Sequence, residues 1–429
     1  MPRMIPVRQT FPAPTVADVA ATVRTEVQQG CAAAGIKAGD SIAVGAGSRG
    51  IVNYDIICRE TVQALQELGA NPFIFPAMGS HGGATSTGQA AVLDHLGISQ
   101  ETMGCPIKSE IEPTQVGTTA DGIPVWIDQH ALSADHMVLV NRIKPHTDFR
   151  GAIESGIMKM GSVGLGKRLG ASACHKAAMH FGFEHTIRTV AALVCNHRPL
   201  AFGLAILENG HEKTAQIEAI PGDRIEAREA ELLEHAKGLQ AKLPFDEVDL
   251  LIVDWMGKNL SGTGMDSNIV GRRMHTREPE MELPRITRLM VCNLTEESGG
   301  NATGIGFADF TTKRLVDRID FETTYINSLT GLGPQKVRIP MHFDTDTRIL
   351  EAAFSTIGMM TPDEACVVRV ESTLQLEEVL ISEAMADKIA ARDDLTPSGS
   401  AIDMPFDDKG LLLPFADTVM SAKEGVYCH

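Results

Sequence analysis

The sequence predicts an α/β protein of two domains, each with a mainly parallel sheet, and an active-site cleft between the domains. Three observations lead to this prediction. The chain has 429 residues, which is too long for one ordinary domain. Its first half repeats the order strand, glycine-containing turn, helix, which is typical of parallel sheets. The same order starts again after a long charged helix.

The first half contains three clear strands and three clear helices. Strands are predicted at residues 41–46, 72–76 and 136–143, where short apolar runs end in glycine-rich or polar loops. Helices are predicted at residues 16–34, 55–68 and 85–96, from apolar residues at helical spacing. Ligands of such folds bind at the carboxyl ends of the strands, so a site is expected in the loops that follow them.

The domain boundary is predicted near residue 245. Residues 223–247 have the pattern of a charged, amphipathic helix that Pro244 ends. We therefore expect a catalytic and cofactor-binding domain over residues 1–245 and a second α/β domain over residues 246–429 that closes the cleft. Further strands and a loop or crossover are predicted in the second domain, at residues 249–254, 286–293 and 365–370 and at residues 393–410 respectively.

The charge of the chain narrows the classes of partner. Lys and Arg number 38 against 55 Asp and Glu, so the net charge is −17. A surface this acidic repels phosphate backbones and anionic membranes, and no run reaches the roughly 18 apolar residues of a membrane span. We expect no nucleic-acid or membrane partner, a cytoplasmic location, and a small anionic substrate held by a local group of cations. Homo-oligomerisation is left open. The eight cysteines, with no CxxC pair, are expected to be mostly reduced thiols.

Three histidines stand beside strand ends or glycine-rich turns. His81 lies in the loop Gly79–Gly83 after the second strand, His146 follows the third strand, and His175 lies further on. A neutral imidazole at such a place can act as an acid or base or bind a metal. It can equally cap a helix or bond to the backbone, and the sequence leaves both interpretations open.

The loop after the third strand is locally basic. Arg142, Lys144 and Arg150 fall close together around His146, an arrangement that suits a carboxylate or a phosphate or forms a solvated basic loop. Lys159 then follows among glycine and apolar residues, where a lysine either becomes nucleophilic or extends its charge to solvent.

Two other motifs are only weak evidence for a phosphate-binding loop and for a zinc site. Gly161-x4-Gly166-Lys167 resembles a phosphate-binding loop, but Arg168 stands where a Ser or Thr would reach Mg²⁺. His175 and His180 are five residues apart and lack the HExxH spacing of zinc enzymes.

A second polar glycine loop follows the first strand of the second half. It runs from Asp254 to Asp266 and contains Lys258. Such a loop suits a lid or an anion cradle, or it is a long structural connection.

The histidine, lysine and glycine motifs together resemble the nickel-pincer lactate racemase family. The resemblance rests on the succession Gly79-x-His81-x-x-Ala84-Thr85, Pro145-His146, a glycine-rich stretch to Lys159, and His175. In that family a nickel-binding histidine follows the lysine by sixteen positions, and His175 follows Lys159 by the same number. The similarity spans roughly residues 40–180 and, more loosely, residues 254–266.

The resemblance implies a cofactor and a role for each residue. The family binds a nickel pincer nucleotide, a pyridinium-3,5-bisthiocarboxylic acid mononucleotide that holds Ni. Lys159 is similar to the lysine that tethers it, and His175 to the protein ligand of nickel. His81 and His146 are similar to the two acid/base histidines of the family. The remaining cofactor-binding positions implied are Arg49 with its neighbour Ser48, near the cofactor phosphate, and Lys258 from the second domain.

The implied reaction is racemisation or epimerisation of a 2-hydroxy acid by reversible hydride transfer. A histidine is too weak a base for the Cα proton, whereas hydride transfer to an oxidising cofactor leaves only the hydroxyl proton for the histidines. The sequence departs from the family in lacking the Asp-x-Thr-Arg run and in carrying Asp148, Arg150 and Glu154 in a longer segment before Lys159. We therefore expect a larger or more polar substrate than lactate, such as a sugar acid.

Two other functions compete with this one. His81, His146 and His175 could surround zinc or iron in a lyase or hydrolase. The two domains could also bind a nucleotide-like ligand without catalysis. A lysine adduct together with bound nickel would separate the racemase from both.

Overall fold

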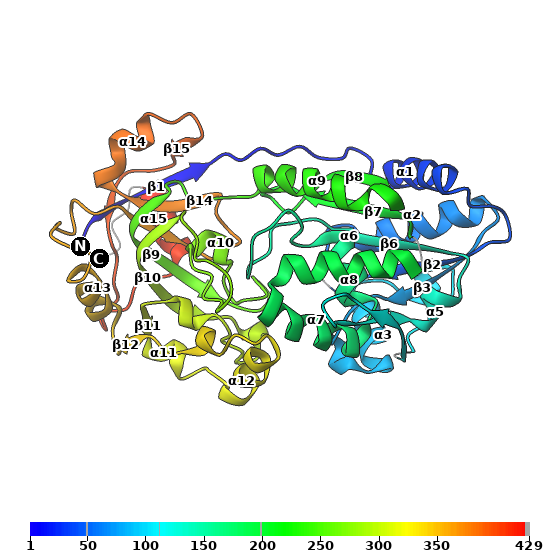
Figure 1. Cartoon of the computed structure of the whole chain (residues 1–429). Helices are drawn as coiled ribbons and strands as arrows, with labels where there is room; N and C mark the ends of the chain where they lie inside the picture. The colour runs from blue at the N-terminus through cyan, green and yellow to red at the C-terminus, as the bar shows by residue number, and fades with distance from the viewer. Residues whose placement is uncertain (49, 111, 198–199, 425–429) are drawn as a thin grey trace. The chain divides into compact units, whose positions relative to one another are not determined.

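The computed structural model describes residues 1–48, 50–110, 112–197 and 200–424 and divides the chain into two compact units (Figure 1). One unit is formed by residues 12–240, and the other by residues 1–11 with residues 241–429. The second unit therefore takes up the N-terminal residues, which we had expected in the first domain. The physical reason is strand β1 (Arg3–Gln9), which pairs antiparallel with β14 (Glu378–Ser382) and β15 (Leu395–Pro397).

The sheet of the 12–240 unit is parallel except at one edge. Its order is β3-β2-β6-β7-β8, and only β8 runs antiparallel to its neighbour. A separate hairpin pairs β4 with β5. The strands are β2 (Ser41–Ala46), β3 (Asn71–Pro76), β4 (Pro113–Thr118), β5 (Pro124–Asp128), β6 (His136–Arg142), β7 (Leu200–Glu208) and β8 (Thr214–Pro221).

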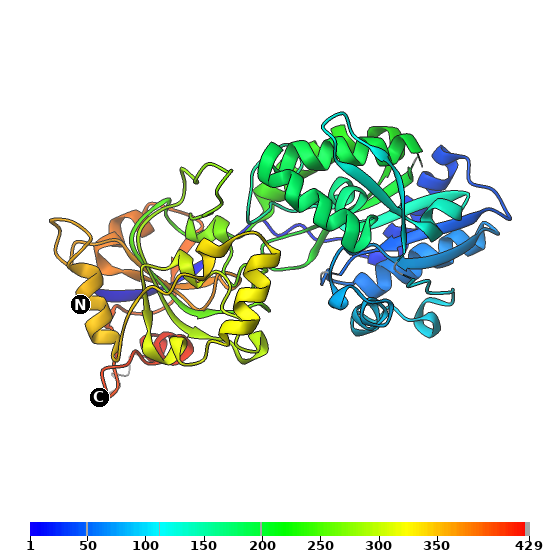
Figure 2. The same cartoon turned by 60° about the horizontal axis from the view of Figure 1, so that its bottom comes forward.

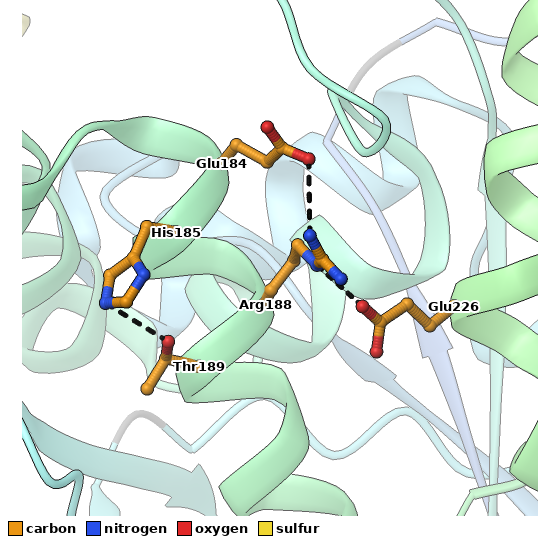
Figure 3. A pocket seen from close by; sticks show the side chains of 5 residues that line it. All are labelled: Glu184, His185, Arg188, Thr189 and Glu226. Carbon is orange, nitrogen blue, oxygen red and sulfur yellow. Dashed lines mark hydrogen bonds and ion pairs between the residues drawn. The ribbon is translucent and has the colours of Figure 1, made fainter.

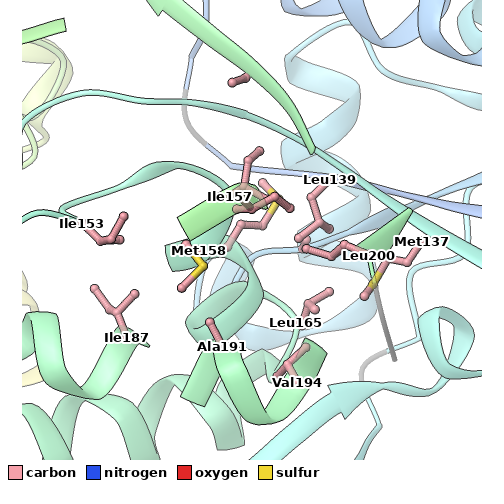
Figure 4. Packing of buried hydrophobic residues seen from close by; sticks show 14 of the residues in the cluster. Met137, Leu139, Ile153, Ile157, Met158, Leu165, Ile187, Ala191, Val194 and Leu200 are labelled. Atoms are coloured by element: carbon pink, nitrogen blue, oxygen red, sulfur yellow. The ribbon is translucent and has the colours of Figure 1, made fainter. Parts of the chain in front are cut away.

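Helices cover both faces of this sheet. The helices are α1 (Val19–Ala34), α2 (Tyr54–Glu67), α3 (Ser86–His95), α4 (Gln100–Met103), α5 (Gln129–Ser133), α6 (Gly156–Lys159), α7 (Lys167–Phe181), α8 (Phe183–His197) and α9 (Ile225–Leu239). Helices are seen on both sides of these strands in Figures 1 and 2. Side chains alternate between the faces along each strand, so Val138 packs with α1 and α2 while Leu139 packs with α8 and α9. Figure 4 shows part of the apolar cluster that contains Leu139, in which residues of β6, α6 and α8 pack together.

The sheet of the other unit is mixed. Its order is β12-β11-β10-β9-β13-β14-β1-β15, with β16 also paired to β1, and the run from β12 to β13 is parallel. From β14 onward each strand runs antiparallel to its neighbour. The strands not yet named are β9 (Glu247–Met256), β10 (Arg285–Leu294), β11 (Phe310–Thr312), β12 (Met341–Phe343), β13 (Val367–Val370) and β16 (Ile402–Asp403).

Helices cover this sheet as well. They are α10 (Ser267–Val270), α11 (Lys313–Val316), α12 (Phe321–Thr330), α13 (Asp346–Phe354), α14 (Ala386–Ala390) and α15 (Phe415–Glu424). Residues of α13 and α15 pack on one face of the sheet, and α10 and α11 contribute to the apolar cluster on the other. The buried guanidinium of Arg369 on β13 binds both carboxylate oxygens of Asp254 on β9, at 2.7 and 2.8 Å.

The predicted fold class is confirmed: this is an α/β protein with two mixed, mainly parallel sheets. The seven described cysteines are free thiols, and all but Cys195 are buried; Cys428 lies outside the described residues. Among those residues, no helix is both long enough and apolar enough to cross a membrane.

Candidate functional site

His81 lies in a loop at the carboxyl end of β3. β3 ends at Pro76, and the loop passes Gly79 before it reaches the exposed His81. The Nδ1 atom of His81 lies 2.8 Å from the hydroxyl oxygen of Ser48, which follows the adjacent strand β2. The structure thus brings two predicted site residues into contact at one edge of the sheet.

A buried amide holds the His81 loop in place. Gln89, on α3, is fully buried, and its side-chain nitrogen donates to the carbonyl oxygens of Met78 at 2.7 Å and Gly79 at 3.1 Å. Its side-chain oxygen lies 3.4 Å from the ammonium of Lys167. The buried, hydrogen-bonded side chains of Gln89 and Lys167 therefore hold the His81 loop in position.

Lys167 is the cation at the centre of this group. Its ammonium donates to the carbonyl oxygen of Pro76 at 2.6 Å and pairs with Asp128 at 3.0 Å. Burial lowers the pKa of Lys167, whereas the charge of Asp128 raises it. The lysine of the phosphate-loop-like motif therefore points into the core and links the start of α7 to the end of β3.

The loop that carries His146 is organised by one buried carboxylate. Glu154 is fully buried, and its oxygens accept the backbone N–H of His146 at 2.8 Å and of Gly151 at 3.2 Å. The same carboxylate pairs with Arg150 at 3.2 Å and with Lys237 of α9 at 3.1 Å. The carboxylate of Glu154 thus holds the backbone of the loop in place, and Arg150 is paired with this carboxylate.

The imidazole ring of His146 is held by its own loop and by α8. Its Nδ1 atom accepts the backbone N–H of Asp148 at 3.0 Å. Its ring lies 4.6 Å from that of Phe149 and 6.3 Å from that of Phe183, measured between centroids. Of the two interpretations that the sequence left open for His146, the bond to the backbone therefore applies to its Nδ1 atom.

Lys159 ends the short helix α6, whose start is fixed from two sides. The carboxylate of Glu229, on α9, accepts the backbone N–H of Ile157 at 2.8 Å and of Met158 at 3.1 Å. The side-chain amide of Asn141, on β6, donates to the carbonyl oxygen of Gly156 at 2.7 Å. These bonds set the backbone within three residues of Lys159.

Glu229 is itself an unusual group. It is buried, and its second carboxylate oxygen has no hydrogen-bond partner among the described residues. Burial raises its pKa to about 8, although the two backbone N–H groups lower it. The carboxyl group therefore titrates near neutral pH.

Lys159 is followed by a π-helical turn over Met160–Gly164, and α7 then carries His175. Turns of this kind often mark functional sites. Burial lowers the pKa of His175, the charge of Lys159 lowers it further, and Asp148 raises it. His175 thus lies within electrostatic range of Lys159 and favours the neutral imidazole that binds metals.

The backbone after Lys159 has open space at one position. Gly161 is buried two residues further on, yet a Cβ atom built there would meet no other part of the molecule within 4 Å. An amine, a neutral imidazole and this space suit a tethered group with its own metal donors, because such a group requires few ligands from the protein. The residues therefore fit a lysine-linked nickel cofactor.

The cations of the basic loop are less available than we expected. Arg142 binds the carboxylate of Glu208 and Arg150 binds that of Glu154. Two of the three charges are thus compensated within the unit. Arg150 and Glu154 also give no support to a larger substrate, since both serve the structure of the loop.

Lys258 belongs to the other unit. It lies in the loop after β9, and its ammonium donates to the side-chain oxygen of Asn327 at 2.8 Å and to the carbonyl of Gly262. Its contribution to cofactor binding stays a prediction. The predicted site residue Arg49 lies outside the described residues.

A surface hollow on α8 contains none of the predicted residues. Figure 3 shows its lining, where Arg188 pairs with Glu226 at 2.6 Å and with Glu184 at 3.6 Å. The guanidinium of Arg188 is thus paired with both carboxylates of the hollow. Within the described ranges, no three side chains of His, Cys, Asp or Glu gather closely enough to hold a metal ion. His81, His146 and His175 therefore do not form the three-ligand metal site of the competing interpretation.

Comparison with known proteins finds a family model that is similar to part of the chain. Residues 19–179 match the family model of the lactate racemase N-terminal domain. A solved structure, the lactate racemase apoprotein from Thermoanaerobacterium thermosaccharolyticum, aligns with a TM-score of 0.48 and 15% identity over 82% of this chain and 87% of that chain. No curated protein matches the sequence.

Proposed function

We propose, from the premise that the chain belongs through residues 19–179 to the lactate racemase N-terminal domain family, that it is a racemase or epimerase of a 2-hydroxy acid. The observation that carries the proposal is the set of candidate site residues that this segment contains. It includes His81, His146, Lys159 and His175, and the last two lie within electrostatic range of each other.

The cofactor proposed is a nickel pincer nucleotide. When bound, it would supply a hydride acceptor for Cα of the substrate. Lys159 would tether it and His175 would ligate its nickel. Ser48 and Arg49 would lie toward its phosphate, and Lys258 would contribute from the other unit.

The chain itself would handle the proton. His81 and His146 are proposed to face the hydroxyl group of the substrate, where an imidazole near neutral pH can take and return a proton. A basic side chain would hold the carboxylate and keep the substrate aligned through the turnover. The substrate proposed is a larger or more polar 2-hydroxy acid than lactate, and the support that remains for this preference is Asp148 and the lack of the Asp-x-Thr-Arg run.

The test is production of the full chain together with the enzymes that make the cofactor. We expect a mass increase on the peptide that contains Lys159, bound nickel, and turnover of a 2-hydroxy acid. Neither nickel nor adduct under these conditions would refute the proposal. Zinc without an adduct would favour a metal-dependent lyase or hydrolase, and a bound nucleotide without any turnover would favour a binding protein.

The substrate class needs its own measurement. Initial rates on lactate, on branched 2-hydroxy acids and on sugar acids should be compared with the same loaded protein. Turnover of lactate much faster than of every larger acid would refute the stated preference while leaving the racemase proposal intact.

A further inference from the structure

The first turn of α6 receives no hydrogen bond from the side chain that precedes it. The first N–H groups of any helix have no partner within the helix, and a serine just before it often supplies an acceptor. Ser155 stands at that position, but its side chain makes no capping bond. Its hydroxyl group instead accepts the backbone N–H of Lys144 at 2.7 Å and donates to the carbonyl oxygen of Lys144 at 2.6 Å. The turn that ends in Lys159 therefore needs an acceptor from elsewhere in the chain.

Glu229 supplies this acceptor from α9. One oxygen of its carboxylate accepts the backbone N–H of Ile157 at 2.8 Å and that of Met158 at 3.1 Å. These are the second and third residues of α6, whose N–H groups a capping side chain normally binds. The Glu229 side chain is buried, so water is not at hand to take its place. Glu229 thus caps α6 from a position 71 residues beyond Met158.

Gly156 makes room for the carboxylate. Its φ is +77°, and a Cβ atom built on it would lie 2.6 Å from the carboxyl carbon of Glu229. Glycine meets both requirements, since it adopts a positive φ at little cost and has no Cβ to collide. On the other side, the side-chain amide of Asn141 donates to the carbonyl oxygen of Gly156 at 2.7 Å. The beginning of α6 is therefore held between β6 and α9.

Helix α9 also supports the loop that carries His146. Lys237, on the same helix as Glu229, pairs with Glu154 at 3.1 Å, and Glu154 in turn binds the backbone N–H of His146. The helix lies outside residues 19–179, the segment that matches the family model. Two segments with candidate site residues are thus held by one helix that the matched segment does not include.

We infer that Glu229 is a positioning residue for Lys159: its carboxylate holds the turn from which the lysine reaches the cofactor. This rests on the proposed function, in which Lys159 is the tether. Lys159 directly follows the two residues whose N–H groups Glu229 binds. A lysine side chain is flexible, so the place its amine can reach depends on where the backbone carries it. Without the carboxylate, two buried N–H groups would lack an acceptor and the turn would lose its fixed position.

Glutamine and methionine at position 229 separate positioning from packing. Both side chains resemble glutamate in length, but only glutamine keeps an oxygen that accepts N–H groups. The full-length variants are produced with the cofactor-making enzymes, and the mass of the folded protein is measured. We expect Glu229→Gln to keep the Lys159 adduct within about twofold of the parent, and Glu229→Met to lose about tenfold or more. Glu231→Gln, an exposed change on α9, is the control and should match the parent.

A purely structural role would give a different result. Glu229→Met would then be less stable, but its folded fraction would carry as much adduct as the parent, and that outcome would overturn the inference. Gly156→Ala covers the case in which Glu229→Met does not fold, because its methyl group would displace the carboxylate from α6. An undiminished adduct in Gly156→Ala would overturn the inference equally.

A second measurement needs no cofactor. Hydrogen exchange at the amides of Ile157 and Met158 reports the two bonds directly. We expect exchange to be about 10- to 100-fold faster in Glu229→Met than in the parent, and close to the parent rate in Glu229→Gln. Unchanged exchange in Glu229→Met would overturn the inference. An absent adduct in the parent would instead refute the proposed function, and the exchange rates would still decide whether Glu229 holds the turn.

Discussion

The ammonium group of Lys167 lies 2.6 Å from the carbonyl oxygen of Pro76, the last residue of β3. This contact joins the beginning of the helix that carries His175 to the strand that leads into the His81 loop. Lys167 adopts a positive φ of 49°, which is uncommon for a residue with a side chain. Lys167 thus adopts a less favourable backbone conformation at the start of α7, and its ammonium group reaches acceptors in the core.

Replacement of Lys167 by methionine should strongly destabilise the protein. The change would leave Asp128 buried without its cation, which typically costs about 3–5 kcal/mol. Urea unfolding of the full chain would measure the loss. The double variant Lys167→Met with Asp128→Asn should recover much of it, and equal stability of the single and double variants would contradict this explanation.

The free energy of unfolding should depend on the ionisation of Glu229. Its pKa in the folded protein is about 8, above its ordinary value of 4.5, so folding favours the protonated form between these values. The contribution of this group to stability is fully present below about pH 4.5 and is lost as the pH rises through about 8. The slope reaches at most about 1.4 kcal/mol per pH unit.

Comparison of Glu229→Gln with the parent from pH 5 to pH 9 tests this dependence. The stability of the variant relative to the parent should rise with pH, because glutamine does not ionise. Glu234→Gln, an exposed change on the same helix, serves as the control and should show no such trend. A constant difference between Glu229→Gln and the parent would remove Glu229 as the titrating group.

Lys159→Ala should abolish covalent retention of the cofactor. Lys159 is the proposed tether at the end of α6, so another lysine should not replace it. Intact-protein mass spectrometry after co-production with the cofactor-making enzymes would measure the adduct. Lys176→Ala, an exposed change on α7, should keep it; an adduct that persists in Lys159→Ala would refute the assigned tether.

His175→Ala should lower the nickel content while the lysine adduct remains. The residue is the proposed protein ligand of the metal, and its low pKa favours the neutral form that binds metal at neutral pH. Metal analysis of the loaded protein gives the answer. His180→Ala, at an exposed position of the same helix, provides the comparison, and equal nickel in both variants would exclude His175 as ligand.

Local patterns predicted the fold well where a segment depends mainly on its own sequence. The strand expected at residues 41–46 is β2 with the same bounds, and the helix expected at residues 85–96 is α3 within one residue at each end. β1 was not predicted, because its strand partners are more than 360 residues away and the prolines in it and around it resemble a loop. The apolar run of β7 also went unrecognised.

The candidate site was predicted only in part, for a related reason. Histidines beside glycine-rich turns identified the loops, since that signal is local. Gln89 and Glu229 gave no signal, and Glu154 stood out only as a departure from the family pattern, because their binding partners are backbone groups whose position depends on tertiary packing. Lys167 did stand out as part of a glycine motif, but that motif indicated phosphate chemistry, whereas the lysine is an internal cation.

The position of β1 has a consequence for the order of assembly on the ribosome. Residues 3–9 are made long before their strand partners β14 and β15, which begin at residues 378 and 395. The intervening unit of residues 12–240 can be synthesised in full before β1 can pair. The nascent chain must therefore keep β1 unpaired until residues 378–397 have been made, and the second sheet can close only then.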